Sequence, residues 1–157
     1  MIFTENIRHF FLGLGFLAIQ IILLRHLKIY GAEADLVLVY LLWLCTQKSR
    51  TEVLLFAALF GLMQDAMTDL WGLNMFSKTL LIFLVHNYLR KVSEHRFILW
   101  QIFILLLAAA LIHNALIILL SLFSELYNSG TALLPILIGG SVYTALAGSF
   151  IYLVRTE

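Results

Sequence analysis

Residues 97–123 read FILWQIFILLLAAALIHNALIILLSLF and contain no Asp, Glu, Lys or Arg. A helix needs about 20 mostly apolar residues to cross the ~30 Å hydrocarbon core of a bilayer, so this stretch is long enough to span a membrane. Five further apolar runs surround it. We therefore predict a single all-α, polytopic membrane domain over residues 1–157 with six transmembrane helices, the second one short, at 7–24, 35–46, 52–70, 74–89, 97–123 and 133–154.

The composition agrees with lipid as the main solvent of this chain. Hydrophobic residues make up 62% and charged residues 12%, against about 45–50% and about 25% in soluble domains. Disordered chains have low hydrophobicity and high charge, and β-barrels alternate apolar and polar residues. A net charge of +1 provides no basic surface for nucleic acid. The N-terminal apolar run has no small-residue cleavage site after it, so we expect it to remain as a membrane anchor.

The distribution of Lys and Arg gives two possible topologies, because cytoplasmic loops are enriched in these residues. With six spans and a cytoplasmic N-terminus, seven basic residues lie inside and two outside. If the short second run does not cross, eight lie inside and one outside. Both arrangements make the loops at 48–50 and 90–96 cytoplasmic and the segments 71–74 and 124–131 external.

Asp65 is the most informative polar residue, because acids at membrane depth are rare and often functional. It belongs to a row, Ala57, Gly61, Asp65 and Asp69, that is spaced by four and so lies on one helix face. Small residues on such a face allow close helix contact. Asp65 is therefore either a polar site at a helix or subunit contact, or a structural hydrogen-bond acceptor for Lys78, His113 or Asn114. We expect Asp69 to be solvated.

The segment Trp71-Gly72-Leu73-Asn74 is expected to form a tight external turn. Gly72 permits a positive φ, Asn74 suits the N-cap of the next helix, and Trp71 suits the membrane interface. Lys78, one turn later, either extends towards the outer surface or pairs with Asp65 or Asp69. His86 and Asn87 are expected at a cytoplasmic interfacial edge.

His113 and Asn114 are expected to face the bundle interior, in a packing hydrogen bond or a ligand contact. His113 has no His or Cys at i+3 or i+4, so we expect no metal site, and no cofactor motif is present. The last expected span carries small residues at Gly140, Thr144 and Gly148, and an adjacent row at Ser141, Ala145 and Ser149. This close-packing face serves either the chain itself or a partner.

No catalytic pattern is present: H-E-x-x-H, G-x-S-x-G and the P-loop are all missing from the sequence. Asp65 and Asp69 stand on one helix, unlike the two-helix aspartate pair of an intramembrane protease. We therefore expect a protein that is not an enzyme.

Residues 60–80, FGLMQDAMTDLWGLNMFSKTL, resemble the signature of the MreD family of bacterial rod shape-determining membrane proteins. In that family a Gly, three residues, an Asp and a polar-to-small stretch precede Gly-Leu-Asn and a long apolar helix. Gly61, Asp65, Gly72, Leu73 and Asn74 match, whereas Asp69 and Trp71 differ from the usual residues. The chain length and short basic loops are also similar.

The resemblance implies a non-enzymatic scaffold of the elongation machinery (elongasome) in the bacterial inner membrane, with both termini cytoplasmic. It also implies an MreC-like single-span partner, further partners in RodA, a class B penicillin-binding protein and MreB, and a role in lateral peptidoglycan synthesis and rod cell shape. The expected fold is similar to the six-helix substrate-binding subunit of energy-coupling factor transporters. The alternative function is therefore a vitamin or small-molecule uptake subunit, with Asp65, Asn74, Lys78, His113 and Asn114 lining an outward cavity.

Overall fold

The computed structural model describes residues 2–27, 32–70, 72–93, 98–123 and 134–156. Within these ranges the chain is all-helical and has no strand. A short 3₁₀ turn, η1 (Leu24–His26), and a π-helical turn, η2 (Pro135–Gly139), accompany six α-helices, which confirms the all-α part of the predicted fold class. The α-helices are α1 (Ile2–Ile22), α2 (Leu36–Cys45), α3 (Arg50–Thr68), α4 (Leu73–Val92), α5 (Leu99–Phe123) and α6 (Gly140–Thr156).

Among the described residues, three helical stretches are both long enough and apolar enough to cross a bilayer: Arg50–Thr68, Leu99–Leu122 and Ile136–Val154. The chain is therefore a membrane protein. α2 has only ten residues, about 15 Å of helix, which is half the thickness of the hydrocarbon core. The expected six crossings stay a prediction.

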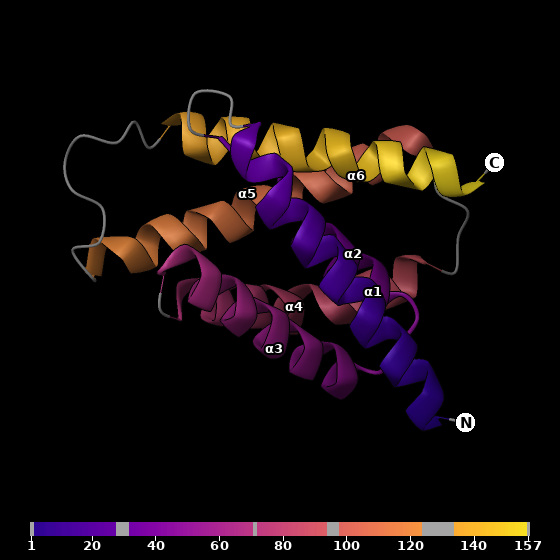
Figure 1. Cartoon of the computed structure of the whole chain (residues 1–157). Coiled ribbons are helices and arrows are strands. Elements are labelled where there is room, and N and C mark those ends of the chain that lie inside the picture. The colour runs from indigo at the N-terminus through magenta and orange to yellow at the C-terminus, as the bar shows by residue number, and fades with distance from the viewer. Residues whose placement is uncertain (1, 28–31, 71, 94–97, 124–133, 157) are drawn as a thin grey trace.

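The helices form an up-and-down bundle in which each helix runs against the one before it (Figure 1). α1 begins and α6 ends on the right of that view, whereas α3 gives way to α4, and α5 ends, on the left. α3 packs mainly against α4, and α5 against α6. α2 contacts α1, α3, α4 and α6, which places it at the centre of the bundle.

The sequence of α2, LVLVYLLWLC, explains its central position. A helix that is apolar all round has no polar face to turn outwards, so it lies in a protein core or in lipid. Nine of its ten residues are buried, and Trp43 is the partly exposed one. The non-helical residues 32–35 lead into it, and Ala32 and Ala34 among them are also buried.

Candidate functional site

Asp65 caps a neighbouring helix from within the bundle. Its carboxylate is fully buried and accepts hydrogen bonds from the backbone N–H of Asn74, the Asn74 side-chain amide and the backbone N–H of Met75, each at 2.9 Å. The first N–H groups of a helix have no partner in that helix, and the positive end of the helix dipole favours an acid there. Asp65 therefore fixes the start of α4 against the end of α3.

This geometry confirms that Asp65 is a buried hydrogen-bond acceptor, but the expected partners were wrong. Asn74 and Met75 take the place of Lys78, His113 and Asn114. Asn74 is also not the N-cap of α4: that position belongs to Gly72, whose φ of 85° suits glycine.

Gly61 lies one turn before Asp65 on the same face of α3. A Cβ atom added to it would lie 2.5 Å from the Cα and 2.8 Å from the backbone nitrogen of Met75. Only a glycine allows the two backbones to approach this closely, as the spacing of the small residues predicts. Asp69, as expected, is exposed, and it ends α3 in the left-handed conformation with φ 60°. Trp71 lies outside the described residues.

Lys78 is fully buried, and its ammonium group lies among three acceptors. Nζ is 2.5 Å from Asp35 Oδ2, 3.1 Å from Asn74 Oδ1 and 3.4 Å from His113 Nε2. An ammonium group carries three N–H donors, so every donor has a partner. Both alternatives expected for Lys78 were wrong, because its helix face points into the bundle, where residues 32–35 bring Asp35.

His113 faces the interior, as predicted, and is almost completely buried. Because Lys78 can only donate, we assign Nε2 of His113 as an acceptor and place the ring proton on Nδ1. Asn114 turns instead to α6, where its amide donates to Ser141 Oγ at 3.0 Å. The described part of the chain holds no cluster of three His, Cys, Asp or Glu residues suited to a metal ion.

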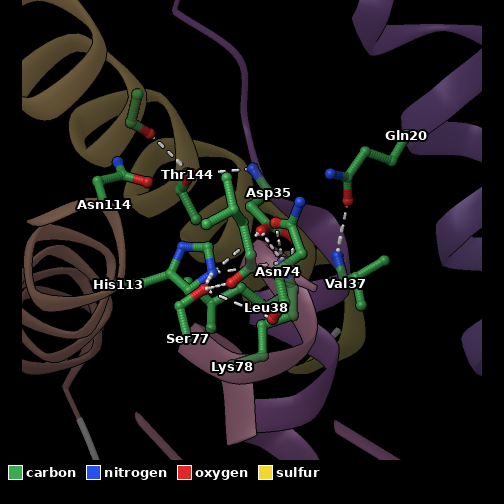
Figure 2. A network of polar contacts seen from close by, with 12 residues as sticks. Gln20, Asp35, Val37, Leu38, Asn74, Ser77, Lys78, His113, Asn114 and Thr144 are labelled. Carbon is green, nitrogen blue, oxygen red and sulfur yellow. Dashed lines mark hydrogen bonds and ion pairs between the residues drawn. The ribbon is translucent and has the colours of Figure 1, made fainter. Parts of the chain in front are cut away.

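Side chains from three helices hold the start of α2 (Figure 2). Asp35 is its N-cap: Oδ1 accepts from the backbone N–H of Leu38 at 2.9 Å, while Oδ2 binds Lys78 of α4. The Asp35 backbone N–H donates to Thr144 Oγ1 of α6 at 3.0 Å. The Val37 N–H donates to Gln20 Oε1 of α1 at 2.9 Å. We call Asp35, Asn74, Lys78, His113 and Thr144 the central polar cluster.

Asp35 and Gln20 are the residues that the sequence analysis missed. Asp35 is the first residue of the predicted second span, 35–46, and no role was predicted for its side chain. One signal was available, because Asp directly before an uninterrupted apolar run is a typical N-cap. Its contact with Lys78, 43 residues later in the chain, has no local signal.

The small residues of α6 pack against other helices of the same chain. A Cβ on Gly148 would lie 2.6 Å from Leu106 Cδ1 of α5, and one on Gly140 would lie 3.2 Å from the Asn114 amide nitrogen. Thr144 binds the start of α2. Of the adjacent row, Ser141 and Ala145 are fully buried. Of the two alternatives for this face, the structure therefore shows packing within the chain.

At the end of the bundle where α1 begins, polar contacts join α1 and α4 to the connection between α2 and α3. Lys48 donates to Glu5 at 3.0 Å, and this hydrogen bond lowers the pKa of the exposed Glu5 carboxyl. His86 Nε2 lies 3.1 Å from the carbonyl oxygen of Lys48. The expectation of an interfacial edge was therefore wrong for His86, which is buried, whereas Asn87 is exposed. The difference arises because α4 turns the face of His86 towards the α2–α3 connection.

The arrangement is suited to holding helices together. Asp65, Asn74, Lys78 and His113 are buried and contact one another in a chain of hydrogen bonds, whereas the transport alternative needs polar groups that line an outward cavity. Buried polar networks of this kind give a bundle a defined arrangement.

Comparison with known proteins identifies the family of this chain. No curated protein and no solved structure matches the chain, so the expected likeness to the transporter subunit stays a prediction. The family model described as rod shape-determining protein MreD matches residues 4–152 of the 157. That range includes residues of all six α-helices. The chain therefore belongs to the MreD family, a family of rod shape-determining membrane proteins rather than a known enzyme family.

Proposed function

We propose that this protein is a non-enzymatic scaffold of the bacterial elongation complex, which binds an MreC-like single-span partner and supports lateral peptidoglycan synthesis. The family match over residues 4–152 carries the proposal. RodA, a class B penicillin-binding protein and MreB are the further partners that the family resemblance implies. The central polar cluster supports an assembly role, because its hydrogen bonds join the start of α2 to α4 and α6.

The proposed topology has six crossings, with both termini on the cytoplasmic side of the inner membrane. The alternating helix directions in Figure 1 support it. The four non-helical residues 32–35 can reach about 13 Å, and α2 adds about 15 Å. Together they cover about the thickness of the hydrocarbon core, so the short second segment is able to cross. Lys48, Arg50, Arg90 and Lys91 then lie on the cytoplasmic side, in accord with the positive-inside rule.

In this proposal the residues singled out in the sequence have a structural task. Gly61, Asp65, Gly72, Asn74 and Lys78 fix the external end of α3 and α4, and thereby the surface offered to the partner. Asp69 and Gly72 lie at that end, where the external part of a single-span partner leaves the membrane.

The test is a gentle purification of the tagged full chain from its native membrane, followed by mass spectrometry of the proteins that remain bound. We expect a single-span coiled-coil protein, with or without the cell-wall synthase. Recovery of paired ATPases with a coupling membrane subunit would contradict the scaffold and favour the uptake alternative.

A further inference from the structure

An apolar groove of about 690 Å³ lies between α4 and α5. Its floor includes the buried side chains of Leu42 in α2, Leu89 in α4 and Ala109 in α5. Its edges include Tyr88 and Ile104, which are 64% and 48% exposed. The groove is thus open towards the side of the bundle, where a membrane protein meets lipid.

The depth of the groove fits one leaflet of the bilayer. On α5 its lining extends from Gln101 to Ile112, a rise of about 16 Å along the helix. A leaflet contributes about half of the ~30 Å hydrocarbon core. A transmembrane helix from another protein would need a contact surface along the whole core. The groove is therefore matched to an acyl chain.

The charge at one end of the groove selects the headgroup. Val92 and Gln101 line the end near the proposed cytoplasmic surface. Lys91 follows Tyr88 by one helical turn, so it continues the edge that Tyr88 forms. Arg90 and Lys91 are exposed, and neither α4 nor α5 contains Asp or Glu. Basic residues between helices at the cytoplasmic surface attract anionic headgroups.

We propose that this groove is a binding site for one anionic phospholipid of the cytoplasmic leaflet, with an acyl chain against Leu42, Leu89 and Ala109 and the headgroup at Lys91. Bound there, the lipid would fill the space between the diverging ends of α4 and α5. The site shares no residue with the central polar cluster. The lipid proposal rests on the proposed topology. Because it involves no contact with a partner protein, a failure to bind lipid leaves the scaffold proposal unchanged.

The test measures lipid retained by the purified full chain in native mass spectrometry, with phosphatidylglycerol and phosphatidylcholine as probes. We expect one phosphatidylglycerol per chain, held more tightly than phosphatidylcholine. Ala108→Trp fills the groove from an exposed position that lines it and should abolish retention. Ala115→Trp is the matched control, because Ala115 is also exposed and lies two turns further along the same face, past the end of the groove.

A second pair of variants tests the headgroup contact without changing the groove. Lys91→Gln should weaken phosphatidylglycerol binding about fivefold, the effect of one basic residue near the membrane surface. Arg90→Gln removes the same charge from another helix face and should change binding less. This pair decides the question if Ala108→Trp does not fold.

Three results would overturn the proposal. The first is equal retention of lipid by Ala108→Trp and Ala115→Trp. The second is equal affinity for the two phospholipids. The third is a photoreactive residue at position 108 that, in native membranes, crosslinks to a protein rather than to lipid, because a protein would then occupy the groove.

Discussion

Lys78→Met should destabilise the protein more than any surface substitution. Methionine keeps the unbranched stem of lysine, so little packing is lost, but the ammonium group disappears. Asp35, whose side chain is only 13% exposed, then loses the partner of Oδ2. Asn74 Oδ1 and His113 Nε2 lose a donor in the same step.

The size of the effect follows from the burial of the pair. Removing one partner of a buried ion pair costs about 3–5 kcal/mol, because the remaining charge stays buried without compensation. Total stabilities of domains are about 5–15 kcal/mol, so the loss is a large fraction. The double variant Asp35→Asn with Lys78→Met removes both charges, and an amide at position 35 still provides an oxygen to cap the Leu38 N–H. We expect it to recover at least ~2 kcal/mol relative to Lys78→Met alone.

The assay is reversible unfolding in mixed micelles with increasing SDS, followed by tryptophan fluorescence. The wild type, both single variants and the double variant complete a double-mutant cycle. A Lys78→Met protein within ~0.5 kcal/mol of the wild type would refute the buried pair, since that is the range of ordinary surface substitutions. A double variant no more stable than Lys78→Met would show that the two side chains are not coupled.

Three further predictions concern the α3–α4 corner and the topology. Gly61→Ala should cost about 1–3 kcal/mol because its Cβ meets the Met75 backbone; Gly15→Ala, with open space around it, should stabilise α1 by up to ~1 kcal/mol in the same unfolding assay. Asp65→Ala leaves three donors of α4 unpaired. We therefore expect less protein in the membrane but an unchanged amount of partner recovered per molecule of this protein. A reduced amount of partner per molecule would instead place Asp65 at the contact with the partner. Cysteines at the exposed positions Gln47 and Asp69 should react with an impermeant thiol reagent from the cytoplasmic and the external side respectively. Labelling of both from one side would contradict the crossing of α3, which the five-span and six-span arrangements share, and the native cysteine is buried.

The helices could be predicted from the sequence because their signals are local. All the apolar runs except the second are long, and charged residues or a glycine turn interrupt the runs. Even the short second helix was expected, since its apolar run stops at Thr46. The boundaries differ by a few residues, as expected where helix ends depend on caps.

The partners of the polar residues could not be predicted in the same way. The spacing of Gly61 and Asp65 indicated one buried face, and both do lie against α4. Which residue of α4 meets Asp65 depends on how far the two helices slide along each other, and the Gly61–Met75 contact sets that position. Lys78 and Asp35 are further apart in the sequence than Asp65 and Asn74 are, and only the packing of α2 inside the bundle brings them together.

The central polar cluster has a task that apolar packing cannot perform. Lipid tails are as apolar as leucine side chains, so the hydrophobic effect does little to select one arrangement of membrane helices over another. α2 is apolar on every side, so burial alone specifies neither its rotation nor its position along the bundle. Hydrogen bonds are directional, and three of them hold the start of α2 from three different helices: Gln20 and Thr144 accept from the backbone N–H groups of Val37 and Asp35, and Lys78 donates to the Asp35 carboxylate. Three such contacts fix both the depth and the rotation of the helix. The cost of burying Asp35 and Lys78 is therefore better explained by the unique position of α2 than by net stability, and a scaffold that offers one fixed surface to its partners requires such a position.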